Sequence, residues 1–518
     1  MFPKLTERSR LFVVAILLTF IAIIHIGRSL LLTVFTRTPI KTGVFNSYRN
    51  ARAMILDRNF HPVAVSVRVY DAWFNPEMVN LKKEQLDRLA EIVNQRPEII
   101  EENISRRRKK RFVYLARNLT PQVALKIKDL NLSGFFLQPN FHRFYPLGSV
   151  AAQLLGKTDI DDNGIEGLEK QYDSHLRVSP LWLTIDDRLE YLAYQTIEKF
   201  VRKFKAEKGT AVIIQPKTGE VLALVNYPSF DPNQHFTPKE IPLLRNYAAV
   251  DLFEPGSTMK SFSAAYALST GKYRSKSLID TNPGVLRIGK DSIHDDKGIN
   301  RGILTFEEVL KKSSNIGISK IILSLNGDDF LNFLLKFGFG KITSSNCPGE
   351  EQGGITTNPD DRFGIATLSF GYGIQVTLLQ LMQAYQIIAN HGLKCSLSLL
   401  SSQKPECWSV IMRETADSVL KMLKRVTEPA GTGYRAAIKD YSVAGKTGTA
   451  RIAEHHGYKT GHIASFIGFA PATDPKLLIG VVLIRPKLAY YSSMVAAPAF
   501  QEIMNQSLKI MHIMPDKI

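Results

Sequence analysis

A long apolar run lies near the N-terminus, where residues 11–27 contain no charged side chain. A second apolar patch follows Arg28 at residues 30–35. A helix that crosses a membrane needs about 20 mostly apolar residues, and the long Arg28 side chain can reach the membrane surface. No small-residue cleavage site follows the run, which disfavours a removable signal peptide. The pattern predicts a transmembrane anchor over residues 11–35, behind a short tail of residues 1–10.

The next segment mixes two hydrophobic periods. Val63–Tyr70 alternate between apolar and polar side chains, as in a half-buried strand, whereas Gln85–Val93 show helical spacing. We therefore predict a separate mixed α/β domain over residues 45–175, which we call the pedestal.

A new pattern begins near residue 181 and continues almost to the C-terminus. Residues 189–205 have helical spacing, and a Pro- and Gly-containing turn at residues 215–220 separates two strand-like runs, as in a hairpin. The strand-like runs of this region are Ala211–Ile214, Val221–Val225, Ile463–Phe469 and Leu477–Ile484. Its length is sufficient for one large core, and we predict a second domain over residues 205–510.

The composition is that of a globular protein, but the charge is unbalanced. Hydrophobic residues make up 44% of the chain and charged residues 22%, which excludes a wholly disordered chain. The formal charge of +18 suggests an anionic partner. Residues 1–150 carry +13 and residues 151–518 only +5, so the excess belongs to the predicted anchor and pedestal. A membrane surface fits that distribution better than a nucleic acid.

An unbroken basic run, Arg106–Arg111, stands out within the pedestal. A nucleic-acid site usually combines such a run with several stacking aromatic residues, and only Phe112 and Tyr114 follow here. We interpret the run as a solvated, charged turn. Acidic lipid headgroups or cell-wall carboxylates are the ligands that would suit it in an anchored protein.

Cysteines are too few to form a disulfide scaffold. The chain has three, and their spacing matches no common zinc motif. Cys395 and Cys407 are twelve residues apart and can either pair in an oxidising compartment or remain separate thiols, and Cys347 is left over. No metal site is predicted.

The strongest candidate nucleophile is Ser257, which follows the chain-breaking pair Pro255-Gly256 and opens a predicted helix rich in small residues. Lys260 lies one turn further along, so both side chains share a face of that helix. A lysine buried near other cations has a lowered pKa, and its neutral amine can accept the serine proton.

Two further motifs accompany this pair, although each is weak alone. Ser313-Ser314-Asn315 lies at a predicted corner between two helices, and Lys446-Thr447-Gly448-Thr449 follows a short apolar stretch, as at a strand edge. Other copies of these patterns occur; Lys-Thr-Gly, for example, is also found at Lys41 and at Lys217 in the hairpin turn. The ordered set of three motifs is far more specific than any one of them.

With these motifs the chain resembles the penicillin-binding proteins, whose signature is Ser-x-x-Lys, Ser-x-Asn and Lys-Thr-Gly. Further segments resemble the division-specific class B enzymes, the FtsI type: Arg52–Ala64, Arg143–Pro146, Gly167–Lys170, Phe370–Gly373 and Ala470–Ala472. Two positions depart from that family. It usually has Arg-Gly-x-Ile and Asp-Arg-x-Gly, where this chain has Ala53 and Phe60 in place of the glycines.

The resemblance implies an α+β fold: a transpeptidase domain with an antiparallel sheet flanked by helices, behind a single transmembrane helix and an elongated pedestal. It implies a serine D,D-transpeptidase that cross-links peptidoglycan stem peptides through an acyl-enzyme, is inhibited by β-lactams and requires no cofactor. In that scheme Ser257 is the nucleophile, Lys260 the base and Ser313 a proton relay. The remaining roles are Asn315 orienting the substrate amide, Lys446 and Thr447 holding the substrate carboxylate, and Gly448 and Thr449 forming the strand edge with an oxyanion-hole amide.

This chemistry also implies a location, because peptidoglycan lies outside the cytoplasmic membrane. We expect a single-pass protein of the bacterial inner membrane with a periplasmic catalytic domain, and a glycan polymerase and other division proteins as partners. Alternatives are an elongation-type class B enzyme, or a penicillin-binding division scaffold with little catalysis. A β-lactamase is disfavoured because no Glu-x-x-Leu-Asn segment follows Ser313.

Overall fold

The structure is a computed structural model that describes residues 51–454 and 457–517. The predicted tail (1–10) and anchor (11–35) lie outside the described residues. Within the described ranges, no helix combines the length and the apolar character that a membrane crossing requires.

A five-stranded mixed sheet organises the N-terminal part of the described chain. Strand β2 (Pro62–Phe74) pairs antiparallel with β1 (Ile55–Leu56), β3 (Val113–Leu119) and β4 (Phe135–Phe144). Strand β1 also pairs in parallel with β7 (Leu181–Trp182). Strand β2 contains the strand that the alternating pattern predicted.

Three helices cover one face of the β3-β2-β4 portion of this sheet. Phe74, Val113 and Leu89 belong to the apolar core that the helices and strands share. The helices are α2 (Lys83–Ile92), α3 (Pro97–Arg106) and α4 (Pro121–Asp129), and shorter elements follow: α5 (Ala152–Leu155), β5 (Lys157–Thr158), β6 (Gly164–Glu166), α6 (Gly167–Gln171) and α7 (Asp173–Leu176). The helical spacing at residues 85–93 thus corresponds to α2.

Three sequence segments that resemble the class B family meet at one buried carboxylate. Glu169 accepts from Arg52 Nε and from Arg143 Nε, each at 2.6 Å. All three side chains are at most 5% exposed. A second carboxylate, that of the partly exposed Asp173, accepts from Arg52 Nη1 at 2.6 Å. One ion-pair network therefore joins the three segments. Removing any one of its three buried side chains would leave a buried charge without compensation.

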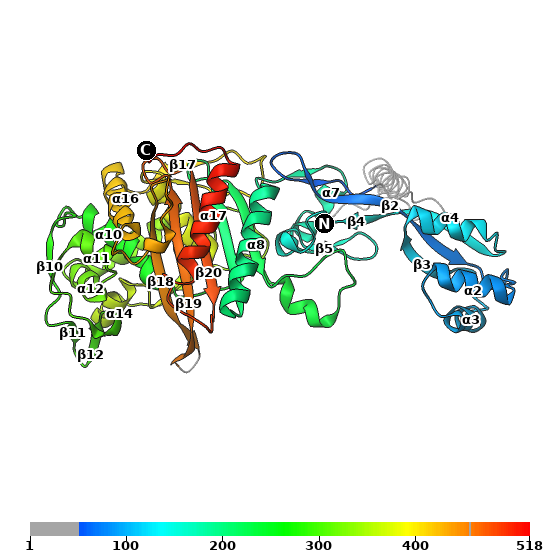
Figure 1. Ribbon diagram of the computed structural model, residues 1–518, viewed down its shortest axis with the longest axis horizontal. Coiled ribbons are helices and arrows are strands. Elements are labelled where there is room, and N and C mark those ends of the chain that lie inside the picture. Colours follow the sequence, from blue (N-terminus) through cyan, green and yellow to red (C-terminus); the bar gives the residue numbers. More distant parts are fainter. Residues whose placement is uncertain (1–50, 455–456, 518) are drawn as a thin grey trace, which may run out of the picture. The chain divides into compact units, whose positions relative to one another are not determined.

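An antiparallel sheet with the strand order β18-β19-β20-β8-β9 forms the centre of the C-terminal part (Figure 1). Its strands are β8 (Lys208–Ile214), β9 (Val221–Tyr227), β18 (Ala444–Glu454), β19 (Gly457–Ala470) and β20 (Leu477–Ile484). Strands β8 and β9 form the predicted hairpin, and its turn uses Gly219 at φ 75°. Strand β18 lies at one edge of the sheet and carries the Lys446-Thr447-Gly448-Thr449 motif.

Helices pack on both faces of this sheet, as Figure 1 shows for α8 and α17 on one side. The pair on that side is α8 (Asp187–Phe204) and α17 (Ala496–Ile510), which share one apolar core with the strands. The helices of the other core are α9 (Tyr247–Val250), α10 (Lys260–Ser269), α11 (Phe306–Lys311), α12 (Asn315–Leu323), α13 (Gly327–Phe337), α14 (Arg362–Leu368), α15 (Leu378–Ala389) and α16 (Arg413–Thr427). Short strand pairs connect them: β10 (Leu278–Asp280) with β13 (Ile303–Thr305), β11 (Val285–Ile288) with β12 (Asp291–His294), β14 (Gly354–Ile355) with β15 (Ile374–Gln375), and β16 (Leu393–Cys395) with β17 (Cys407–Ser409).

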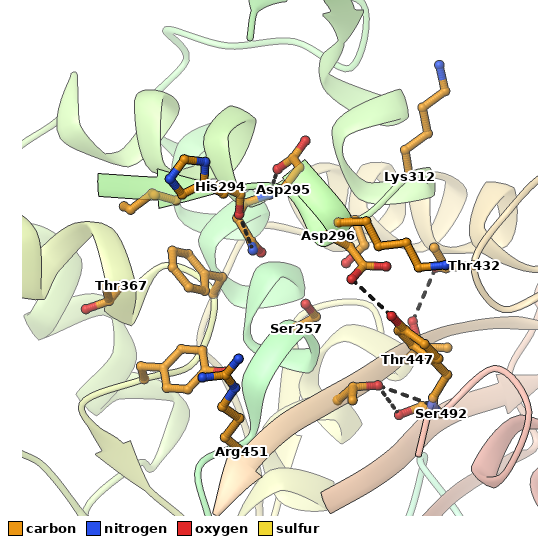
Figure 2. Close-up of a pocket in the computed structure, with 18 of the residues that line it drawn as sticks. Ser257, His294, Asp295, Asp296, Lys312, Thr367, Thr432, Thr447, Arg451 and Ser492 are labelled. Carbon is orange, nitrogen blue, oxygen red and sulfur yellow. Dashed lines mark hydrogen bonds between the residues drawn. The ribbon is translucent and has the colours of Figure 1, made fainter. Parts of the chain in front are cut away.

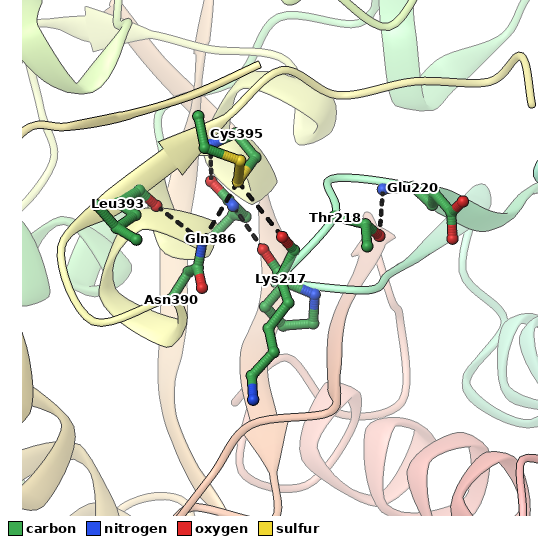
Figure 3. The surroundings of a disulfide bond; sticks show 9 residues. Lys217, Thr218, Glu220, Gln386, Asn390, Leu393 and Cys395 are labelled. Carbon is green, nitrogen blue, oxygen red and sulfur yellow. Dashed lines mark hydrogen bonds between the residues drawn. A yellow bond between two sulfur atoms is a disulfide. The ribbon is translucent and has the colours of Figure 1, made fainter. Parts of the chain in front are cut away.

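The structure decides the open question about the cysteines. Cys395 and Cys407 lie opposite each other on β16 and β17 and form a disulfide, whereas Cys347 is a buried free thiol. Gln386 of α15 accepts from Cys395 N at 3.2 Å and donates to Pro216 O of the β8-β9 turn, so it connects the β16-β17 hairpin to the central sheet (Figure 3). Closing a loop of this size stabilises a fold by about 3 kcal/mol in the chain-entropy model.

Candidate active site

A cleft of about 880 Å³ opens where the 3₁₀ turn η4 (Gly256–Met259), the corner before α12 and strand β18 meet (Figure 2). Its wall includes Ser257, Ser313, Asn315, Thr447 and Thr449. The three motifs selected from the sequence therefore lie in one place, although 189 residues separate Ser257 from Lys446.

Ser257 lies in a 3₁₀ turn, η4 (Gly256–Met259), that leads directly into α10. The predicted helix is thus a tight turn followed by an α-helix. Gly256 has φ 55° and donates from its amide to Gly371 O at 3.2 Å. A Cβ on Gly371 would come within 2.2 Å of Gly256 O, which explains why the Phe370–Gly373 segment needs glycine there.

Lys260 connects the first two motifs. Its Nζ lies 3.1 Å from Ser257 Oγ, 2.7 Å from the backbone oxygen of Ser313 and 2.7 Å from Asn315 Oδ1. The two carbonyl oxygens can only accept, so a neutral amine that donates both protons to them keeps its lone pair for the two hydroxyl oxygens within reach, Ser257 Oγ and Ser313 Oγ, each 3.1 Å away. This geometry is suited to proton abstraction from the serine hydroxyl.

Lys446 connects the third motif to the second. Its Nζ donates to Ser313 Oγ at 3.0 Å, and Lys260 Nζ lies 3.1 Å from the same oxygen. Thr447 Oγ1 donates to Thr432 Oγ1 at 3.2 Å. The Ser313 hydroxyl therefore lies between two lysine amines and can exchange protons with either.

Both lysines are fully buried, and burial shifts their proton affinities. Desolvation lowers the pKa of Lys260 well below its ordinary value, and the neighbouring charge of Lys446 lowers it further. Desolvation alone lowers the pKa of Lys446 to about 7. A neutral Lys260 beside a protonated Lys446 is consequently an accessible state near neutral pH.

Asp295 fixes the corner that carries Ser313 and Asn315. Its Oδ1 accepts from the amides of Asn315 at 2.6 Å and Ile316 at 3.1 Å, while Ser314 Oγ donates to both of its carboxylate oxygens. The carboxylate is 3% exposed and also pairs with Arg301 Nε at 3.0 Å.

The backbone at this corner is unusual. Ser313 has φ 57°, in the left-handed region that non-glycine residues seldom occupy. Ser314 is the N-cap of α12 and accepts from Gly317 N. The preceding helix α11 begins with a capping box of Thr305 and Glu308. Caps and the Asp295 hydrogen bonds together hold a conformation that the local sequence alone would not favour.

Strand β18 closes tightly against η4. A Cβ on Gly448 would come within 2.8 Å of both Pro255 O and Thr258 Cγ2, so only glycine permits this approach. Ser492 holds the strand from the other side, because its amide donates to Thr449 Oγ1 at 3.1 Å and its hydroxyl donates to Gly448 O. The resemblance to the penicillin-binding proteins assigns the oxyanion hole to the backbone amides of Ser257, in the 3₁₀ turn η4, and of Thr449, on β18.

Sequence reasoning missed Asp295, Thr432 and Ser492, since each contacts the motifs only across the fold. The repeated Lys-Thr-Gly pattern at Lys217 lies in the hairpin turn, where Lys217 is half-exposed and pairs with Asp474. No local pattern points to Asp295, because it lies twenty residues before Asn315 in the sequence.

Comparison with known proteins agrees with this geometry. The family model "Penicillin binding protein transpeptidase domain" matches residues 209–505, and "Penicillin-binding Protein dimerisation domain" matches residues 48–180. Peptidoglycan D,D-transpeptidase FtsI of Escherichia coli strain K12 is 36% identical over 521 residues, covering 92% of this chain and 88% of the relative.

Two further comparisons agree. The probable peptidoglycan D,D-transpeptidase PbpC of Pseudomonas aeruginosa is 35% identical over 501 residues, covering 90% of this chain and 88% of that protein. The apo structure of the TP domain of Burkholderia pseudomallei penicillin-binding protein 3 is 33% identical with a TM-score of 0.59, covering 65% of this chain and 98% of that one. The chain belongs to the class B penicillin-binding proteins.

Proposed function

We propose that this protein is a peptidoglycan D,D-transpeptidase that cross-links stem peptides of the septal cell wall through a serine acyl-enzyme. The carrying observation is the Lys260 amine, which contacts Ser257, Ser313 and Asn315 at 2.7–3.1 Å inside a cleft. The names of its FtsI relatives support the same reaction.

In acylation, Lys260 removes the proton from Ser257 Oγ as that oxygen attacks the carbonyl between the two terminal D-alanines. The backbone amides of Ser257 and Thr449 stabilise the oxyanion, and each such donor is worth about 3 kcal/mol in acyl-transfer enzymes. Collapse of the tetrahedral intermediate expels D-alanine, and the leaving amine takes the proton through Ser313. The ester bond between Ser257 and the donor peptide remains.

Transfer reverses these proton movements. An amine of a neighbouring stem peptide attacks the ester carbonyl, Lys260 or Ser313 accepts its proton, and Ser257 leaves as the hydroxyl. Asn315 orients the donor amide through its side chain, which is already fixed by Lys260 and by His294 O. The product is a new amide cross-link.

Lys446 and Thr447 select the substrate. A protonated Lys446 amine beside a threonine hydroxyl binds the terminal carboxylate of the stem peptide, and Gly448 allows the peptide to lie along β18. A β-lactam carries an equivalent carboxylate beside its reactive amide, so it acylates the same serine.

The reaction also determines the orientation of the chain in the bacterial inner membrane. The anchor at residues 11–35 would leave residues 1–10 in the cytoplasm and place the cleft in the periplasm. The pedestal and anchor would contact a glycan polymerase and other division proteins, which supply the polymer to be cross-linked.

Labelling with a fluorescent penicillin tests the nucleophile. Wild-type protein should be labelled and Ser257→Ala should not, whereas a labelled alanine variant would refute the assignment. A reconstituted assay with lipid-linked precursor and a polymerase should yield cross-linked dimers only with an intact Ser257. Full complementation of a depleted strain by Ser257→Ala would instead favour a scaffold.

A further inference from the structure

Four aromatic side chains gather on one face of the pedestal sheet. Trp73 of β2 lies in register with Tyr114 of β3 and with Phe136 of β4. Directly paired residues point to the same face of a sheet, so these three rings form a row across three strands. Phe112 joins the row, with its ring centroid 4.7 Å from that of Trp73 and 4.8 Å from that of Tyr114.

This row lies on the face opposite the pedestal helices. Neighbouring positions Phe74, Val113 and Leu115 point into the core beneath α2 and α3. The rings on the other face are not covered in the same way, because Phe112, Tyr114 and Phe136 are 39–43% exposed. Large aromatic side chains that remain accessible together are typical of an interaction surface.

The basic run Arg106–Arg111 continues directly into Phe112. All six of its residues are exposed. Arg106 pairs with Glu102, and in the part of the chain that the structure describes the other five cations have no ion-pair partner. We call the four aromatic residues and this run the aromatic–basic patch.

The geometry of the rings restricts what can bind. Trp73 and Phe136 are stacked, with centroids 4.3 Å apart and planes 23° apart, so their faces cover each other. Sugars and nucleic-acid bases stack on open ring faces, and here Phe136 already covers a face of Trp73 while the Arg117 guanidinium lies 4.8 Å from the centroid of the Tyr114 ring. The exposed ring edges and the adjacent cations instead resemble the aromatic and basic side chains that proteins place at a lipid–water interface.

We propose that the aromatic–basic patch binds the surface of an anionic lipid bilayer. The unpaired cations of the run contact lipid phosphates, and the ring edges of Phe112, Tyr114 and Trp73 enter the headgroup region. This inference rests on the proposed membrane anchor, which would keep the pedestal close to the bilayer. The patch would thereby fix the pedestal against the surface from which the lipid-linked precursor is supplied.

The fluorescence of Trp73 can report contact with lipid, because the chain contains only three tryptophans and the other two can be replaced. Full-length protein with Trp182→Phe and Trp408→Phe would be reconstituted into vesicles of phosphatidylcholine alone or with phosphatidylglycerol, each containing a brominated lipid that quenches tryptophan. Quenching of Trp73 should be at least about twofold stronger in the anionic vesicles and should weaken in high salt. Equal quenching in the two vesicle types, or none in either, would overturn the proposal.

A charge variant tests whether the cations of the basic run bind the anionic lipid. Replacing residues 107–110 by glutamine should abolish the difference between the two vesicle types. The matched control replaces Lys83, Arg88, Lys126 and Lys128 by glutamine, which removes four exposed cations from α2 and α4 on the helix-covered face and should leave the difference unchanged. If both variants behave alike, the run has no specific role.

Two control measurements on the same samples distinguish a failure of the lipid-binding proposal from a failure of the proposed function. Flotation with the vesicles reports the anchor, and penicillin labelling of Ser257 reports the folded catalytic cleft. Protein that floats and is labelled, yet shows no lipid-dependent quenching of Trp73, would refute the patch while leaving the transpeptidase proposal intact. A protein partner docking on the patch predicts that outcome.

Discussion

Lys260 and Lys446 are chemically identical side chains that burial has adapted to opposite tasks. The proposed mechanism needs Lys260 neutral, as a base, and Lys446 protonated, as a carboxylate ligand. Both pKa values are lowered by desolvation, and that of Lys260 is lowered further by Lys446. The positive charge of Lys446, the carboxylate ligand, therefore also helps to keep Lys260, the base, neutral.

This coupling predicts a bell-shaped pH dependence of penicillin acylation. The rate constant should rise as Lys260 loses its proton, and should fall above the pKa of Lys446, about 7, as the carboxylate ligand becomes neutral. In Lys446→Met, loss of the neighbouring positive charge should raise the pKa of Lys260, so the acid limb should move to higher pH. Stopped-flow acylation between about pH 5 and pH 10 would measure this, and an unmoved acid limb would contradict the coupling.

The backbone conformation of Phe60 lowers the stability of the fold by an amount that can be measured. It replaces the glycine usual in the family, has φ 65° and is 73% exposed. A left-handed conformation costs a side-chain-bearing residue about 1–2 kcal/mol, whereas glycine adopts it freely. Phe60→Gly should therefore raise the free energy of unfolding by about 1 kcal/mol in denaturant titration. Phe60→Ala keeps the Cβ and should gain little; an equal gain would show that backbone strain is not the cause.

At the scale of elements, the corner between α11 and α12 is held by one carboxylate from outside both helices. Asp295→Asn keeps an acceptor oxygen but removes the charge that accepts from Ser314, Asn315 and Ile316. Charge-assisted hydrogen bonds contribute about 1.5–3 kcal/mol, so acylation by penicillin should slow about 10- to 100-fold. The slowing should appear in the acylation step, because Ser313 and Asn315 both lose their support.

The neighbouring Asp296 provides the matched control. It lines the same cleft but contacts Tyr491, at 3.3 Å, rather than the corner. Asp296→Asn should therefore acylate at nearly the wild-type rate. Equal rates for the two variants would mean that Asp295 does not position the corner.

Local and non-local contributions can be separated at this scale. Ser257 and Lys260 are three residues apart, so helical geometry alone predicts their contact. The contact between Lys446 and Ser313 joins residues 133 positions apart, and only the resemblance to a family indicated it. Asp295 and Ser492 act across the fold without any sequence motif, and no periodicity points to them.

On the scale of the whole molecule, the buried carboxylate of Glu169 links segments that are more than a hundred residues apart in sequence. Removing one partner of a buried ion network typically costs about 3–5 kcal/mol, because the remaining charges lose their compensation. Glu169→Gln should lower the free energy of unfolding by about that amount, since it takes from the buried Arg143 its ion-pair partner and leaves Arg52 with the partly exposed Asp173 alone. Denaturant titration followed by circular dichroism would measure the change.

Asp173→Asn tests whether the burial of Glu169 is the reason for the expected large loss of stability. Asp173 binds the same Arg52, but its side chain is 30% exposed, so water can compensate for the lost charge. Its effect should be about 1 kcal/mol or less. Comparable losses in the two variants would contradict the argument from desolvation.

By itself the sequence determined the periodic and local features: the apolar run at residues 11–27, the β8-β9 hairpin and the serine–lysine pair on one helical face. These depend on backbone geometry over a few residues, which the side-chain pattern expresses directly. Only the tertiary structure decided that Cys395 pairs with Cys407, that Asp295 supports Ser313, and that Trp73 and Phe136 complete the aromatic row begun by Phe112. Those outcomes depend on strand register and on burial, which are properties of distant segments packed together.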